Sequence, residues 1–136
     1  MKNSLFRRVL LGLAFFLALG YGLTWASDVH NLSASEAQVL ILENQNNPAF
    51  VILDVRTPAE YGQGHIAGAQ LLDYKSARFS EGLERLDKTK TYFVYCRTGN
   101  RSGRALQLME SMGFGNIYHL SAGIMDWASH KLPLVK

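Results

Sequence analysis

The chain has few cysteines and few prolines: of its 136 residues, one is cysteine and three are proline. A single cysteine excludes a disulfide within the chain, although domains that work outside the cytoplasm ordinarily use their cysteines in pairs. An unpaired thiol in an oxidising compartment is a liability unless the protein uses it. The scarcity of cysteine therefore makes Cys96 the first candidate for chemistry.

Excess positive charge is also missing once the first residues are set aside. The chain has 14 Lys plus Arg against 11 Asp plus Glu, and the three basic residues that make the difference are Lys2, Arg7 and Arg8. The remaining 110 residues, 27–136, are therefore formally neutral. This balance predicts no nucleic-acid partner, and the length suits one compact domain.

Residues 1–26 are predicted to be a signal peptide. The basic start precedes an apolar run from Val9 to Leu23, and Thr24-Trp25-Ala26 places small residues where a signal peptidase cleaves. Cleavage after Ala26 predicts an exported protein. The alternative is an uncleaved membrane anchor, because the uncharged stretch from Val9 to Ser27 spans 19 residues, the length of a membrane helix. Membrane contact is expected only through this segment.

After a lead-in at 27–34, the chain alternates predicted helices and strands. A capping box at Ser33–Glu36 predicts a first helix of about ten residues, ended by 44–48. Further helices are predicted at 58–61, 76–86, 102–112 and 123–129, and strands at 50–53, 69–72, 91–95 and 116–120. This alternation predicts an α/β fold with a parallel sheet and helices on both faces. Reactive loops are then expected beyond the carboxyl ends of the strands, where Asp54 and Cys96 fall.

Cys96 opens a loop rich in arginine and glycine, directly after the predicted strand 91–95. The first N–H groups of the following helix and the guanidinium groups of Arg97 and Arg101 are expected to converge on an anion. Such surroundings lower the pKa of a cysteine from its ordinary value of about 8.5 and suit a nucleophilic thiolate. The alternative is an inert buried cysteine. The flanking arginines and Gly99, which lets the backbone turn over the side chain, favour the reactive thiol.

Four motifs follow one another in the chain: Leu53–Tyr61, Gly64–Ala69, Cys96–Ser102 and Leu120–Trp127. Together they resemble the single-domain rhodaneses, most closely the small periplasmic ones related to phage-shock protein E. The resemblance extends over about residues 35–134, so we assign 35–136 to a rhodanese domain with a mostly parallel sheet of about five strands. The last motif departs from the family at Ala122, where a glycine is usual.

The resemblance implies a periplasmic thiosulfate sulfurtransferase in which Cys96 is the catalytic nucleophile and holds the transferred sulfur as a persulfide. The acceptor would be a thiol or cyanide, with a thioredoxin-like protein as a possible physiological partner. The residues implied in donor binding are Arg97, Thr98, Gly99, Asn100, Arg101 and Ser102. We expect no cofactor. We also expect no metal, because His30, His119 and His130 lack the spacing of metal ligands.

Four further residues are predicted to support the site without reacting. Asp54 is expected to accept backbone N–H bonds in the turn after its strand. Arg56 and Glu60 are spaced to form an ion pair across the same turn. His65, bounded by glycines, is expected to be a structural hydrogen-bonding residue, since sulfur transfer from a thiolate needs no general base. Trp127 is expected in the core.

Two other functions stay open from the sequence. A cysteine phosphatase or arsenate reductase would use a similar loop, but phosphatase loops place their arginine one position further from the cysteine than Arg101 stands. The shorter loop suits a single sulfur atom better than a phosphate. A non-catalytic binding module of the same fold is the second alternative, although such modules typically have lost the cysteine.

Overall fold

Five parallel strands form one sheet in the computed structural model, which describes residues 26–136. The strands are β1 (Asp28–Leu32), β2 (Phe50–Asp54), β3 (Gln70–Leu71), β4 (Thr91–Tyr95) and β5 (Asn116–Leu120), in the order β1-β5-β4-β2-β3. Every strand pair is parallel. The predicted fold class is therefore confirmed. The signal peptide or anchor predicted for residues 1–26 lies, except for Ala26, outside the described residues.

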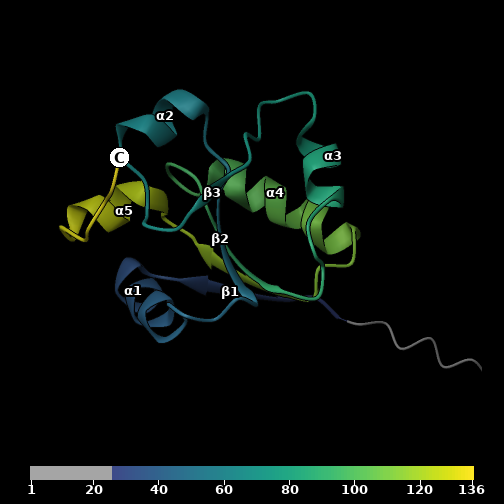
Figure 1. The fold of residues 1–136 in the computed structure, drawn as a ribbon, viewed down its shortest axis with the longest axis horizontal. Coiled ribbons are helices and arrows are strands. Elements are labelled where there is room, and N and C mark those ends of the chain that lie inside the picture. Colours follow the sequence, from purple (N-terminus) through teal and green to yellow (C-terminus); the bar gives the residue numbers. More distant parts are fainter. Residues whose placement is uncertain (1–25) are drawn as a thin grey trace, which may run out of the picture.

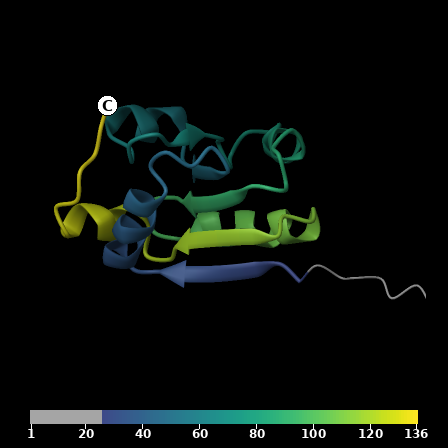
Figure 2. The same cartoon turned by 60° about the horizontal axis from the view of Figure 1, so that its bottom comes forward.

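Helices cover both faces of the sheet (Figure 1). They are α1 (Ala34–Glu43), α2 (Pro58–Gln63), α3 (Phe79–Glu84), α4 (Asn100–Ser111) and α5 (Gly123–Ser129). The helices α1 and α5 pack on one face, and α3 and α4 pack on the other. In Figure 2 the arrowheads of the strands point toward the end of the molecule where α2 and α5 lie. Within residues 26–136, no helix is long and apolar enough to cross a membrane.

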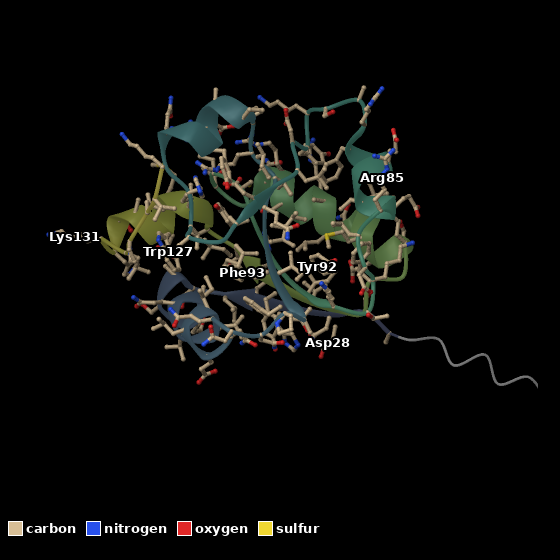
Figure 3. The ribbon with its side chains drawn as sticks, in the orientation of Figure 1. Asp28, Arg85, Tyr92, Phe93, Trp127 and Lys131 are labelled. Carbon is tan, nitrogen blue, oxygen red and sulfur yellow. The ribbon has the colours of Figure 1, made fainter. Side chains whose placement is uncertain are left out.

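The two faces of the sheet hold separate hydrophobic clusters, because successive side chains of a strand point to opposite faces. On β4, Tyr92 and Val94 pack with α3 and α4, whereas Phe93 and Tyr95 pack with α1 and α5. Figure 3 shows Phe93 on the same side as Trp127 of α5. Trp127 is 2% exposed, which places it in the core as expected. Burial on both faces explains why β2 and β4 read as continuous apolar runs.

The strand β1 differs from the prediction, which assigns residues 27–34 to a lead-in. It pairs with β5 along its whole length, from Asp28 beside Asn116 to Leu32 beside Leu120. As an edge strand it is only half covered, so polar residues interrupt its apolar pattern and weaken the sequence signal. Its pairing brings Asn31 beside His119 on β5.

Most helix boundaries lie close to the predicted ones. The Ser33–Glu36 capping box is formed, with the Ser33 N–H donating to Glu36 Oε2 at 2.8 Å. Three helices differ from the prediction: α2 continues to Gln63 beyond the predicted 58–61, α3 is shorter than 76–86, and α4 begins at Asn100 instead of Ser102. The early start of α4 follows from Gly99, whose φ of 95° turns the loop directly into the helix.

Candidate active site

Cys96 lies at the carboxyl end of β4, between the strand and the first turn of α4. It is 1% exposed and packs in the cluster beneath α3 and α4. The neighbouring strand β2 ends at the same level, since the Val55 N–H donates to the Tyr95 carbonyl at 3.0 Å. The loops after β2 and β4 are therefore adjacent, as the sequence predicted for Asp54 and Cys96.

The loop supplies hydrogen-bond donors to the sulfur. The Gly99 N–H lies 3.1 Å from Cys96 Sγ, and the Ser102 hydroxyl lies 3.3 Å from it. Burial alone raises the pKa of the Cys96 thiol, but hydrogen bonds from Ser102, Thr98 and Gly99 outweigh burial and hold the pKa below its ordinary value. The thiolate is thus stabilised mainly by neutral donors of its own loop.

Two glycines, which have no Cβ, let this loop pack closely against the segment that leads into α5. A Cβ at Gly99 would clash with the Ser121 carbonyl, and a Cβ at Gly123, where φ is 72°, would clash with the Arg97 carbonyl. The Ile124 and Met125 N–H groups, in the first turn of α5, donate to the Cys96 and Arg97 carbonyls at 2.9 and 3.1 Å. The first turn of α5 has no side-chain cap, so its free N–H groups are available to hold the Cys96 and Arg97 carbonyls in place.

Asp54 and Arg56 form a buried ion pair, in place of the predicted pair between Arg56 and Glu60. Asp54 accepts the Arg56 backbone N–H at 2.9 Å, as expected for a turn-capping aspartate, and also the guanidinium at 2.7 Å. The Arg56 guanidinium donates to the Gly64 carbonyl at 2.8 Å and lies over the Tyr95 ring. The predicted Arg56–Glu60 pair is wrong because Asp54 is nearer along the chain and faces the same buried space.

Glu60, on α2, pairs with Arg101 in the first turn of α4. The two guanidinium nitrogens lie 2.7 and 2.8 Å from the two carboxylate oxygens, a bidentate geometry. The same carboxylate accepts the Thr57 N–H at 3.0 Å and completes a capping box at the start of α2. Arg101, with these bonds from Thr57, holds the pKa of Glu60 well below its ordinary value despite partial burial. Of the two guanidinium groups expected at the site, those of Arg97 and Arg101, the second is therefore neutralised by Glu60.

Arg97, the residue after Cys96, lines a hollow of about 380 Å³. The other lining residues are Arg56, Glu60, Gln63, Ile124 and Met125. The Met125 side chain is 51% exposed at this rim. Thr98 and Asn100 are also exposed on the loop. Among the ion pairs of residues 26–136, none involves Arg97. Its charge faces a space that a small anion could enter.

His65 has structural contacts only. Its Nδ1 lies 3.0 Å from the Tyr61 carbonyl, and its ring stacks on the Tyr61 ring at 3.6 Å. Its backbone forms an antiparallel bridge with Val135. These contacts make His65 a hydrogen-bonding residue that ties the carboxyl terminus to the connection after α2.

Sequence reasoning named Ser102 as a donor-binding residue but missed the buried polar contacts that it makes behind the sulfur. Ser102 is fully buried, and its hydroxyl contacts both Cys96 and the ring of His119, which contacts Asn31 in turn. No sequence signal pointed to this chain of contacts, because Asn31 lies on the unpredicted strand β1. In the described part of the chain, no three His, Cys, Asp or Glu residues are grouped to hold a metal ion.

Comparison with known proteins agrees with this geometry. The family model described as "Rhodanese-like domain" matches residues 37–130. A sulfurtransferase of Allochromatium vinosum is 38% identical over 87 residues, which cover 62% of this chain and 78% of that protein. Thiosulfate sulfurtransferase GlpE of Pseudomonas entomophila is 31% identical over 103 residues, covering 76% and 88%.

Two further matches fix the extent of the similarity. A probable adenylyltransferase/sulfurtransferase, MoeZ of Mycobacterium tuberculosis, is 40% identical over 84 residues, but these cover only 21% of its length and 62% of this chain. The crystal structure of a rhodanese-related protein from Thermoplasma volcanium superposes with a TM-score of 0.65 at 30% identity, covering 78% of this chain and 97% of the other.

Proposed function

Since the chain belongs to the rhodanese-like domain family, whose named relatives include sulfurtransferases, we propose that it is a thiosulfate sulfurtransferase that works through a persulfide on Cys96. The observation that carries this proposal is the buried sulfur at the end of β4, which receives hydrogen bonds from Gly99 and Ser102. A thiolate held in this way is a nucleophile at neutral pH.

The reaction has two displacements on sulfur. In the first, the Cys96 thiolate attacks the outer sulfur of thiosulfate, a new S–S bond forms, and the old S–S bond breaks so that sulfite leaves with its electron pair. In the second, an acceptor thiolate or cyanide attacks the terminal persulfide sulfur, and Cys96 leaves as a thiolate. The loop N–H groups that stabilise the thiolate would equally stabilise the charged persulfide.

Arg97 is the residue we assign to the sulfonate end of the donor. Arg97 directly follows Cys96, is exposed and lines the hollow described above. Arg101 was expected to share this task, but its bidentate pair with Glu60 already uses two of its donors and balances its charge. We therefore assign Arg101 to holding the loop, while Thr98 and Asn100 contribute backbone N–H groups and exposed side chains at the rim.

Intact mass spectrometry tests the proposal directly. Thiosulfate should add one sulfur atom, about 32 Da, to the protein, and cyanide should remove it. The Cys96→Ser variant should gain nothing, which assigns the adduct because the chain has no other cysteine. A wild-type protein that never gains sulfur would favour the binding-module alternative, and hydrolysis of an aryl phosphate would favour the phosphatase.

Location and acceptor belong to the same proposal. We propose export followed by cleavage after Ala26, which would leave β1 intact because this strand begins at Asp28. The physiological acceptor would be a periplasmic thiol, for which a thioredoxin-like protein is a candidate.

N-terminal sequencing of protein from the periplasmic fraction tests the proposed export and the cleavage after Ala26. Full-length protein released from membranes only by detergent would favour the anchor.

A further inference from the structure

A chain of three polar side chains leads away from Cys96 toward the edge of the sheet. The Ser102 hydroxyl, on α4, lies 3.3 Å from Cys96 Sγ and 2.7 Å from His119 Nε2. His119 Nδ1, on β5, lies 2.9 Å from Asn31 Oδ1 on β1. Ser102 is 0% and His119 6% exposed, whereas Asn31 is exposed. A continuous hydrogen-bonded path thus joins the buried sulfur to the surface of the edge strand.

The donors and acceptors of this path allow two arrangements of its protons. The Asn31 carbonyl oxygen only accepts, so His119 Nδ1 carries a hydrogen in both. In the first arrangement, the Cys96 thiol donates to Ser102, and Ser102 donates to an unprotonated Nε2. In the second, a protonated Nε2 donates to Ser102, and Ser102 donates its single hydrogen to the Cys96 thiolate. The heavy atoms keep the same places in both.

We propose that His119 is a positioning residue of sulfur transfer, which takes the proton of Cys96 through Ser102 while Asn31 fixes its tautomer. This inference rests on the proposed function, because it explains how the nucleophile is prepared. The balance is simple: the S–H bond breaks as a Ser102 O–H bond forms, and the original O–H bond breaks as an Nε2–H bond forms. A neutral pair becomes a thiolate and an imidazolium.

The surroundings of His119 restrict when its ring can be charged. Burial lowers the pKa of His119, which favours the neutral ring. The facing groups are Ser102 from α4, Asn31 from β1 and, through Ser102, Cys96 from the loop after β4. Arg101, next to Ser102, is paired with Glu60. Within residues 26–136, no carboxylate forms a hydrogen bond or ion pair with the ring. The Cys96 thiolate is therefore the counter-charge that makes the imidazolium favourable.

A core histidine satisfied by two hydrogen bonds would have the same contacts without exchanging a proton. The variant His119→Gln separates the two roles, because glutamine can keep a hydrogen bond to Ser102 but cannot accept a proton. If the relay operates, the midpoint at which the thiolate forms should rise by about one pH unit, a tenfold change in the thiol–thiolate equilibrium. A purely structural His119 leaves that midpoint unchanged.

The thiolate can be followed by its ultraviolet absorbance near 240 nm, with Cys96→Ser as the blank. The matched control is His130→Gln, which removes a half-exposed histidine at the end of α5 and should leave the midpoint in place. This titration requires no sulfur donor. It therefore tests the proton transfer to His119 even if the persulfide is never detected. An unchanged midpoint in folded His119→Gln overturns the proposal.

Asn31 provides a second test at a residue that is exposed, in contrast to the buried His119. Asn31→Leu removes the acceptor for Nδ1–H and should raise the thiolate midpoint. Asn31→Asp restores an acceptor at that position and should bring the midpoint back to the wild-type value or below it. Equal midpoints for the leucine, aspartate and wild-type proteins overturn the relay, whether or not His119→Gln folds.

Discussion

The ends of β2 and β4 each hold a buried acidic group, Asp54 and Cys96, but the two groups have different hydrogen-bonding partners. Asp54, the last residue of β2, is fully buried and neutralised by Arg56, two residues further along the chain, with contacts at 2.7 to 3.0 Å. Cys96 is equally buried, but only neutral N–H and O–H groups contact its sulfur. One anion is fully paired, and the other keeps its capacity to react.

This difference separates the structural loop from the reactive one. A buried carboxylate with its own guanidinium is already satisfied and gains nothing from a ligand. A sulfur stabilised by hydrogen bonds alone can exchange one charge distribution for another, from thiolate to persulfide, with the same donors in place. The pair of Glu60 with Arg101 joins α2 to the first turn of α4, and Arg97 remains at its hollow without an ion-pair partner among the residues that the structure describes.

The largest expected effect is the loss of sulfur transfer in Cys96→Ser. The hydroxyl is nearly isosteric with the thiol but does not ionise at neutral pH, so we expect transfer from thiosulfate to cyanide to fall by at least about a thousandfold. The free energy of unfolding should change by less than about 1 kcal/mol. The chain has no other cysteine that could carry a persulfide. Substantial residual transfer by the variant would therefore contradict the persulfide mechanism.

Asp54→Asn should have the opposite profile, with its main effect on stability. The change leaves Arg56, 5% exposed, as a buried charge without its counter-charge, and such a loss costs about 3 kcal/mol. Urea denaturation measures it. The control is Glu81→Gln, which breaks the exposed pair with Arg85 on α3 and should cost a few tenths of a kcal/mol. Similar losses for both variants would contradict the proposed division between the loops.

Most of the fold could be predicted from the sequence, since apolar runs and capping signals have local causes. The buried strands β2 and β4 and the helix α1 with its capping box were found from their own residues. The strand β1 was missed because an edge strand owes its conformation to its neighbour, here β5, more than to its own pattern.

The site was predictable only where its contacts are local. The position of Cys96 beyond β4 follows from the strand pattern. The choice of ion-pair partners does not, because Arg56 could reach Asp54 or Glu60 by spacing alone, and Glu60 finds Arg101 41 positions away. The contacts of His119 with Ser102 and Asn31 likewise need the tertiary structure, since three separate elements supply them.

Arg97→Gln should weaken donor binding and leave the loop intact. We expect the KM for thiosulfate to rise about tenfold, about 1.4 kcal/mol of binding, with a smaller change in kcat. The rate should also become less sensitive to salt, because a charged contact is lost. Arg104→Gln is the control, since Arg104 is exposed on α4. Unchanged kinetics in Arg97→Gln would assign donor binding to the backbone N–H groups alone.

Glu60→Gln should have the smallest effect, one that depends on pH. The pKa of Glu60 is lowered in the folded protein from 4.5, chiefly by Arg101, so the pair stabilises the fold above pH 4.5, and this contribution is lost as the pH falls through the folded-state value. At neutral pH the variant should be less stable by about 1 kcal/mol, because the pair is partly exposed. Below pH 4.5 the gap to wild type should close. Urea denaturation at a series of pH values measures the gap, with the exposed Glu43→Gln as control. A gap that stays constant with pH would mean that the carboxylate charge does not link α2 to α4.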